Sequence, residues 1–570
     1  MLARGKGKWL GNVSHFPDAA LTPSVAEILR SAHHLWRRHR PIAASRWGPP
    51  VLDATMDLSD QGLEHWRGAL ASLQTSVTTA RREVFSPLDE AVLAELQRFI
   101  HEQMIQDAQE FQVRITPYLH LITHALLPFH LPPPQDLEMN IALQDRLGDC
   151  VDWLRQGQRR LEAGALGVAE GDRLMASHLA QSLAQWNNPY LGPGVVALRE
   201  QLFQWAQIPP RPPKQPSPRI NARWYLEAVL DIPHSIEQIQ ELCAERLRVE
   251  VNHLGRTLST NATTITPPAT LDGRDASEES ALAWIDRIAA DLRRHVEGVI
   301  LDQVGPPARV CPVPDLLAPL VDDALYLPPT TTGGPSQGAG WFLFPRAFLE
   351  SAVEPQRRAA LMAIVAHEVC PGHGEQLRRA ARSPLTLLYE ITRSPIGLEG
   401  WAVWAEGAIL QMQDVPPGAE IGVYAHRVRR LLAAVQVLTA VTEGREAAQT
   451  RTTKLLAPLP FLERQRLLAV HHRRGWVPVM YAVGLMETER ALDKVAEKLG
   501  VHSADSTVAE AFLAWGPLAP SRITELITRN RLGAADTDAD NNPSDSFQGT
   551  TMAAPAATSA LSTRGNIGSA

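Results

Sequence analysis

The sequence is poor in lysine and lacks any long apolar run. Only six of its 55 basic residues are lysine, and the arginines cluster clearly only at Arg37-Arg38-His39-Arg40, which a solvated helix face explains. With a formal net charge of −7 over 570 residues, this composition gives no electrostatic reason to expect binding to nucleic acid or an acidic membrane surface. No apolar run approaches the ~18 residues of a membrane-crossing helix, so we expect no membrane partner either.

Cysteine is also scarce, with four residues that form no Cys-x-x-Cys pair. This excludes a disulfide framework and a structural zinc knuckle. The first residues are basic but have no apolar segment behind them, so they do not resemble a secretory signal. We therefore expect a globular, cytoplasmic protein.

Most of the chain has the periodicity of amphipathic helices, as at Leu93, Leu96, Phe99 and Ile100. Ser235 and Gln238 form a capping-box pattern at the start of another helix. The pattern predicts a mainly α protein with at most a small β-sheet. The aromatic run at 341–345 is the best candidate strand, expected at one edge of that sheet beside a helix over about 355–369.

Changes in composition suggest where the chain divides. A proline cluster begins at Ile208, and after Leu532 almost no large apolar residue remains. We predict an N-terminal extension over 1–19, a helical subdomain over 20–206, a Pro-rich linker over 207–219, a metal-binding catalytic helical region over 220–532, and a disordered tail over 533–570.

The residues that carry chemistry begin with His367-Glu368-Val369-Cys370-Pro371-Gly372-His373. On a continuous helix, a histidine six residues after His367 would be rotated by about 600° and would point away from it. Proline disrupts the helix and glycine frees the backbone, so a Pro-Gly turn can swing His373 back toward His367. The two imidazoles then suit a zinc ion, with Glu368 as the base that activates a water for attack on a carbonyl.

A second segment, predicted to be helical over about 399–412, carries two glutamates. Glu399 and Glu406 are seven residues apart and so share a helix face. One of them can ligate the metal while the other orients a histidine or binds the substrate. We assign Glu399 as the third metal ligand, beside His367 and His373, and Glu406 to substrate binding.

Other candidates favour structural roles. His120 and His124 have the i,i+4 spacing of zinc ligands, but no carboxylate of fitting spacing accompanies them, which favours a packed or hydrogen-bonded pair. Cys370 is close enough to His367 to approach a metal as thiolate, but a buried inert cysteine is the simpler interpretation.

The segment 366–373 resembles the His-Glu-x-x-Pro-Gly-His-His signature of the bacterial family known as domain of unknown function 885. Residues 398–406 resemble that family's Glu-Gly-Trp-Ala block, and weaker similarities lie at 224–225, 325–329 and 481–484. The resemblance implies a large helical metallopeptidase-like fold with a deep central cleft, a zinc ion, and hydrolysis of peptide or small amide substrates. Such a cleft would favour short or flexible peptides.

The sequence departs from the family pattern at two points. Gly374 stands where the family has a second consecutive histidine, and on a continuous helix position 374 would share the face of His367. Gly475-Trp476 replaces a Pro-Gly pair before Tyr481, which we assign as a hydrogen-bond donor to the transition state. Arg393 can bind a substrate carboxylate or form a structural ion pair.

These observations support a zinc-dependent peptide or amide hydrolase. The alternative is a degenerate relative that binds a peptide or small molecule without hydrolysis, which the missing histidine at position 374 suggests. A purely structural helical scaffold would leave the grouped His, Glu and Trp residues unexplained. The sequence does not indicate an oligomeric state.

Overall fold

The computed structural model describes fifteen stretches of the chain. They are residues 21–45, 56–83, 86–106, 115–129, 137–186, 192–212, 221–232, 234–261, 278–318, 324–329, 339–345, 355–412, 419–468, 476–516 and 518–529. Helices dominate these stretches, and their strands form one small sheet, so the predicted mainly α fold is confirmed.

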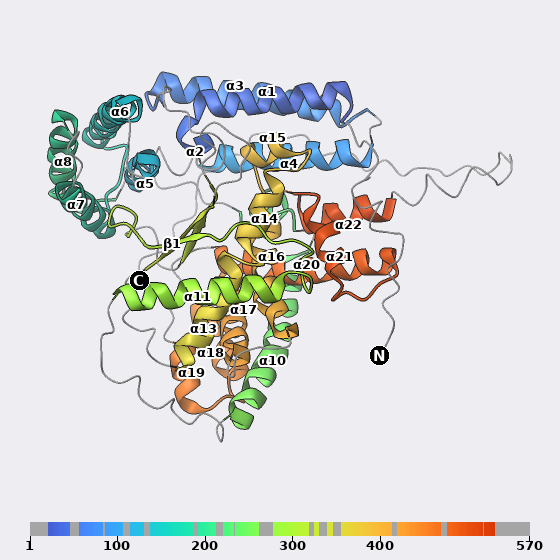
Figure 1. The fold of residues 1–570 in the computed structure, drawn as a ribbon. Helices are drawn as coiled ribbons and strands as arrows, with labels where there is room; N and C mark the ends of the chain where they lie inside the picture. The colour runs from blue at the N-terminus through green and yellow to red at the C-terminus, as the bar shows by residue number, and fades with distance from the viewer. Residues whose placement is uncertain are drawn as a thin grey trace, which may run out of the picture. The chain divides into compact units, whose positions relative to one another are not determined.

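The helices of the first half differ widely in length, from 5 residues in α2 to 26 in α6 and in α10 (Figure 1). They are α1 (Pro23–His39), α2 (Pro41–Ser45), α3 (Asp60–Ala80), α4 (Pro87–Gln106), α5 (Thr116–Leu126), α6 (Leu137–Glu162), α7 (Glu170–Gln185), α8 (Pro193–Ala206), α9 (Ala222–Ala228), α10 (Ile236–Asn261) and α11 (Glu278–Val296), with the 3₁₀ turn η2 (Leu127–Phe129) after α5.

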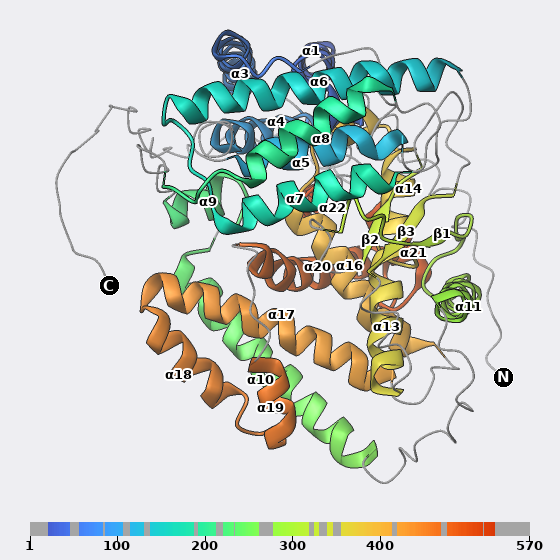
Figure 2. The same cartoon turned by 90° about the vertical axis from the view of Figure 1, so that its left-hand side faces the viewer.

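In the second half, α13, α16, α17 and α20 lie close together (Figure 2). The helices of this half are α13 (Pro355–Glu368), α14 (His373–Ala380), α15 (Thr386–Ile391), α16 (Pro395–Ala408), α17 (Ala419–Thr442), α18 (Arg445–Leu455), α19 (Phe461–Leu468), α20 (Val477–Leu499), α21 (Ser506–Leu513) and α22 (Pro520–Arg529), with the 3₁₀ turn η3 (Ile409–Gln411) after α16. In this half α16 packs along α20, and α17 packs against α10, α13 and α20.

Local sequence sets several of these helix ends. The predicted capping box is present, since the Ser235 backbone N–H donates to the Gln238 side chain (2.9 Å) and the Gln238 N–H donates to the Ser235 hydroxyl (3.2 Å). Helix α16 begins four residues earlier than expected, because Ser394 caps it by accepting from the Gly397 N–H and Pro395 fits its first turn. The predicted helix over about 355–369 corresponds to α13.

The sheet has the strand order β1-β3-β2, with β1 (Arg309–Pro312) parallel and β2 (Leu325–Leu327) antiparallel to β3 (Trp341–Phe344). The predicted aromatic strand is therefore present, but its expected place at the edge of the sheet was wrong. Three of its four residues are buried, and the backbone N–H and C=O groups of a buried strand need hydrogen-bond partners on both sides. Strand β2 was not predicted as a strand, and it is the one that reaches the site.

The buried apolar side chains form three large clusters. One joins α1, α3 and α4 to α13–α16 and α20–α22, and another lies between α9, α10, α17 and α20. The cluster around α5–α8, which we call the α5–α8 core, draws almost all its members from residues 42–206. The helices before the proposed 207–219 linker thus have a core of their own and also share one with the later region.

One compact unit extends to Arg529. The predicted extension over 1–19 and tail over 533–570 lie outside the described residues. Among the helices that are described, none combines the length and apolar character needed to cross a membrane.

Candidate metal centre

The helix is interrupted by a turn between α13 and α14. The Gly372 N–H donates to the Ala366 carbonyl (2.8 Å), which folds residues 369–372 back over the end of α13. A Cβ atom on residue 372 would lie 1.8 Å from the His367 carbonyl oxygen, so only glycine fits this turn. The helix ends at Glu368 and a new one begins at His373, as the Pro-Gly pair predicted.

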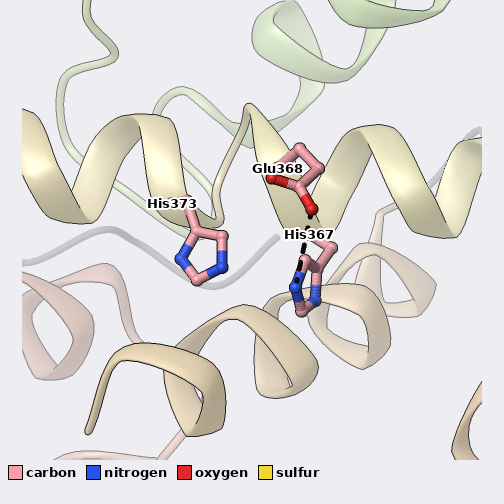
Figure 3. Close-up of side chains that lie close together, drawn as sticks. All are labelled: His367, Glu368 and His373. Carbon is pink, nitrogen blue, oxygen red and sulfur yellow. Dashed lines mark ion pairs between the residues drawn. The ribbon is translucent and has the colours of Figure 1, made fainter. Parts of the chain in front are cut away.

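This turn brings the two histidines together. The ring centroids of His367 and His373 lie 4.8 Å apart, at an angle of 81° between the rings. Figure 3 shows the two imidazoles on facing sides of the turn, with Glu368 beside His367. Side chains of His367, Glu368 and His373 form a buried group whose ligand atoms lie within 4.8 Å of one another, and this group could hold a metal ion.

Glu399, in the second turn of α16, faces both histidines. Its Oε2 lies 3.6 Å from Nε2 of His367 and 3.6 Å from Nε2 of His373. These separations are long for hydrogen bonds but close to the ~3.3 Å between two ligands of one tetrahedral zinc ion. Glu399 Oε2 is buried and has no hydrogen-bond partner in the described part of the chain. His367, His373 and Glu399 are therefore candidates to hold one ion together.

The charge of Glu399 suits that arrangement. Burial raises the pKa of a carboxyl group, but the attraction of His367 and His373 outweighs it and holds the pKa of Glu399 far below its usual value. Its side chain is also the most exposed of the group, at 21% against 4% for His367 and 10% for His373. A small molecule would therefore reach the group past Glu399.

Glu368 is anchored by one oxygen and faces His367 with the other. Its Oε2 accepts a hydrogen bond from the Tyr326 backbone N–H on β2 (2.9 Å), while Oε1 lies 3.9 Å from His367 Nε2. Burial raises the pKa of Glu368, and the two histidines only partly oppose this. A carboxylate with a raised pKa and one anchored oxygen suits proton transfer.

Glu406 lies behind His367. It is fully buried, and its Oε1 is 2.7 Å from His367 Nδ1, which donates to it. Arg430, on α17, donates to the same oxygen. Burial raises the pKa of Glu406, but Arg430 and His367 lower it to about 2. These contacts match the histidine-orienting role rather than the substrate contact that we assigned first.

Tyr481 reaches the site from α20. Its ring centroid lies 6.0 Å from that of His367, and the Arg430 guanidinium lies 4.8 Å from the centre of the Tyr481 ring. Helix α20 approaches α16 closely at Gly400 and Gly484, where a Cβ on either residue would lie under 3 Å from the backbone of the other. This glycine contact brings Tyr481 within reach of the histidines.

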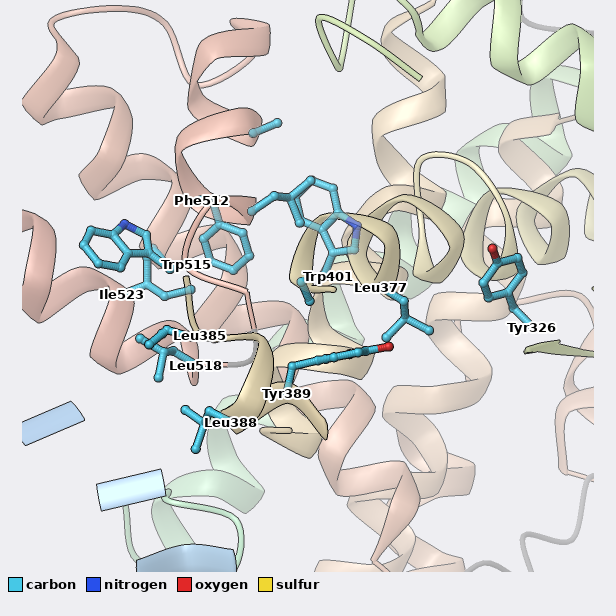
Figure 4. Close-up of a cluster of buried hydrophobic side chains, with 14 of the residues drawn as sticks. Tyr326, Leu377, Leu385, Leu388, Tyr389, Trp401, Phe512, Trp515, Leu518 and Ile523 are labelled. Carbon is cyan, nitrogen blue, oxygen red and sulfur yellow. The ribbon is translucent and has the colours of Figure 1, made fainter. Parts of the chain in front are cut away.

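Trp401 holds the turn from the side of the core. Its indole N–H donates to the Pro371 carbonyl (2.9 Å), and its ring stacks on Phe512 at 5.6 Å. Figure 4 shows Trp401 among Phe512, Leu377 and other buried side chains. Trp401, two residues after Glu399 in the sequence, thus fixes the segment that leads into His373.

Gly374 and Cys370 lie outside this group of side chains. Position 374 does not return to the face of His367, because the helix ends before it; a Cβ there would meet the Val369 carbonyl (2.4 Å) and the Tyr326 ring (3.3 Å). Gly374 and Cys370 line a separate pocket with Glu375. Burial raises the pKa of Cys370 well above its usual value, which fits an inert thiol.

Arg393 has a different environment from the one expected for a ligand-binding arginine of this site. Its guanidinium lies 4.7 Å from the centre of the Tyr389 ring, and it lines a pocket with Gln376 and Leu518. That pocket includes neither His367 nor His373. Its assignment to a substrate carboxylate stays a prediction.

The sequence analysis missed Arg430 and the backbone contact of Tyr326. Tyr326 lies in one of the short segments that resemble the family, and that resemblance was the available sequence signal for its place at the site. Arg430 is one of several arginines on α17, and nothing in the local sequence sets it apart. Only the tertiary contact of α17 with α16 shows that Arg430 is the arginine that meets Glu406.

The fold is shared with solved structures of low sequence identity. A "putative lipoprotein" from Colwellia psychrerythraea matches with a TM-score of 0.63 and 13% identity, covering 89% of this chain and 99% of that one. A "putative lipoprotein of unknown function" from Shewanella oneidensis matches with a TM-score of 0.57 and 13% identity, over 88% and 99% of the two chains. At this identity the likeness shows the fold alone.

A carboxypeptidase from Pyrococcus furiosus matches with a TM-score of 0.37 and 12% identity, over 90% of this chain and 99% of that one; this likeness is too low to carry an argument. No curated protein matches the chain. Residues 220–437 match the family described as "Bacterial protein of unknown function (DUF885)". This range contains every residue of the candidate site described above except Tyr481, and the match supports the family resemblance of that region.

Proposed function

We propose that the protein is a zinc-dependent hydrolase of peptide or peptide-like amide bonds. The observation that carries the proposal is the position of Glu399 Oε2, 3.6 Å from Nε2 of both His367 and His373, in a largely buried site. A carboxylate and two imidazoles are a common ligand set of catalytic zinc, with a further position open to water.

His367, His373 and Glu399 would hold the ion. Zinc held there would supply a Lewis acid that polarises the substrate carbonyl and lowers the pKa of a bound water. When the His367 ring is neutral, its proton is on Nδ1 and is donated to Glu406, and the lone pair of Nε2 then faces Glu399 and His373. The tautomer of this histidine is therefore the one that metal binding needs.

Glu368 would act as general base. With Oε2 held by the Tyr326 N–H, Oε1 is free to accept a proton from the attacking water and to deliver it to the leaving amine. Tyr481 would donate a hydrogen bond to the developing oxyanion, because its ring lies beside His367. Arg393 is proposed to bind a substrate carboxylate, and the substrate is proposed to be a short or flexible peptide.

The alternative of a relative that binds without hydrolysis started from the absence of a histidine at position 374. In this fold a side chain at 374 would point to the Val369 carbonyl and the Tyr326 ring, so the replacement by glycine removes no ligand from the group. No other observation favours the alternative. It is retained only as an outcome of the experiment.

The test combines metal analysis with a peptide library. We expect about one zinc per chain in the purified protein, cleavage of some peptides, and loss of cleavage with zinc retained in Glu368→Gln. Removal of the base should lower kcat by about 10²- to 10⁴-fold. Zinc without cleavage in the unaltered protein would indicate a binder, and failure to bind zinc after incubation with it would overturn the proposal.

A further inference from the structure

We infer that Arg430 is a positioning residue of the metal centre, which holds the Glu406–His367 pair and the Tyr481 ring in place together. The inference rests on the proposed function, because it concerns the affinity of the same site for zinc. It also makes a statement about the metal-free protein, where it can be tested separately.

The first contact of Arg430 is with the carboxylate behind His367. Arg430 Nη1 and His367 Nδ1 both donate to Oε1 of Glu406, and Arg430 Nη2 lies 3.4 Å from His367 Nδ1. The Glu406 side chain is 0% exposed, so water cannot replace a lost donor. Without Arg430, Glu406 would keep His367 as its one close ion-pair partner in the described residues, and a buried carboxylate in that state is costly.

This cost would fall on the metal ligand. Glu406 fixes the orientation and tautomer of His367 only while its own oxygen stays where Arg430 holds it. If the carboxylate turned to find another donor, Nε2 of His367 would lose its alignment with Glu399 and His373. Loss of such outer partners typically lowers metal affinity by about 10- to 100-fold.

The second contact of Arg430 is with the predicted transition-state donor. The guanidinium lies 4.8 Å from the centre of the Tyr481 ring, within range of a cation–π interaction. One planar group thus bridges a carboxylate on α16 and an aromatic ring on α20. A lysine at this position would keep the charge but not the flat shape that makes both contacts at once.

Helix α17 carries a matched ion pair that serves as a control. Arg427, three residues before Arg430, lies 3.6 Å from the buried Glu250, which also pairs with Arg246 at 2.9 Å; the side chains of Arg427 and Glu250 are 11% and 3% exposed. The exposures of Arg430 and Glu406 are similar, at 16% and 0%. Only the Arg430–Glu406 pair touches His367. Comparing variants of Arg427 and Arg430 therefore separates an effect on the stability of the fold from an effect on the position of His367.

The experiment measures zinc dissociation constants by chelator competition for Arg430→Gln, Arg430→Lys and Arg427→Gln, with melting temperatures of the metal-free proteins. We expect both glutamine variants to lower the melting temperature and Arg430→Gln alone to weaken zinc binding, by about 10- to 100-fold. Arg430→Lys should recover only part of that loss. An unchanged affinity in Arg430→Gln, an equal loss in Arg427→Gln, or a full recovery with lysine would each overturn the inference.

A second readout needs no metal. In selectively ¹⁵N-histidine-labelled, metal-free protein, the imidazole signals of His367 should change in Arg430→Gln and not in Arg427→Gln, and Glu406→Gln should reproduce the change. If the unaltered protein bound no zinc, the proposed function would fail while this readout still decided the role of Arg430. Unchanged His367 signals would overturn the inference on their own.

Discussion

Two regions of the molecule each hold a pair of histidines and a buried tryptophan, and among the described residues only one of them forms a group that could hold a metal ion. In α5, His120 and His124 have the i,i+4 spacing that zinc ligands often have on a continuous helix. In the α13–α14 region the spacing is less regular and the helix is broken, yet the rings of His367 and His373 lie 4.8 Å apart. Among the described residues the metal-binding group is formed only there.

The difference lies in what surrounds each pair. His120 is exposed, and α5 is packed into the α5–α8 core through its apolar face. Around His367 and His373, by contrast, α13 and α16 supply three carboxylates, and hydrogen bonds fix one oxygen of Glu368 and one of Glu406. A pair of imidazoles becomes a metal site when other elements bring carboxylates to it, so spacing on one helix is insufficient.

The largest expected effect comes from deleting one histidine of each pair. His373→Ala should lose tightly bound zinc, because it removes one of three ligands, whereas His120→Ala should keep the zinc content of the unaltered protein. Elemental analysis after desalting measures both. Zinc retained in His373→Ala, or lost in His120→Ala, would contradict the contrast between the two regions.

The next effect concerns the turn. Gly372→Ala places a Cβ where the His367 carbonyl lies, so the turn must shift, and overpacking of this kind costs ~1–3 kcal/mol. We expect a lower melting temperature and a zinc affinity reduced by more than about tenfold, since the shift moves a ligand.

Gly68, on α3, provides the control for the turn, since a Cβ there would meet nothing within 4 Å. Gly68→Ala should leave zinc affinity unchanged and raise stability slightly, by roughly 0.5–1 kcal/mol for a helical glycine. Equal zinc affinity in both glycine variants would show that the turn tolerates a side chain.

A smaller effect is expected from pH. In the metal-free protein burial and Arg430 lower the pKa of His367, but Glu399 and Glu406 outweigh them and raise it to about 9. Below that pH the ring carries a proton that zinc must displace, so affinity should fall by about tenfold for each unit of pH below 9. Above about pH 9 this dependence should vanish. Calorimetry in buffers of different ionisation enthalpy counts the released proton, and zero protons at pH 7 would contradict the assignment of His367 as a ligand.

The smallest effect compares the two tryptophans. Trp401 donates to the Pro371 carbonyl (2.9 Å) in the turn, and Trp153, in the α5–α8 core, donates to the Met56 carbonyl (2.7 Å). Substitution of either by phenylalanine leaves a buried carbonyl without its donor, at a cost of ~1–3 kcal/mol. Chemical denaturation should show similar losses, but only Trp401→Phe should also weaken zinc binding. An identical zinc affinity in both variants would mean that Trp401 does not position the turn.

Much of the site could be predicted because its signals are local. Proline and glycine between two histidines change the backbone wherever they occur, and the seven-residue spacing of Glu399 and Glu406 places both on one face of α16, where both meet His367. The same kind of argument failed for Gly374, because it assumed a continuous helix beyond Pro371. It also did not decide between the two roles considered for Glu406, because a shared helix face does not show which nitrogen of His367 each glutamate meets.

The sequence by itself determined the helices, several of their caps, the turn at Pro371-Gly372 and the identity of the residues in the group, because each depends on neighbours a few residues away. Only the tertiary structure decided that Arg430 from α17, Tyr481 from α20 and the Tyr326 backbone from β2 converge on this group. Those contacts depend on how distant helices pack, as at the glycine contact of α16 with α20. Packing of that kind is a property of the whole core, and no local pattern encodes it.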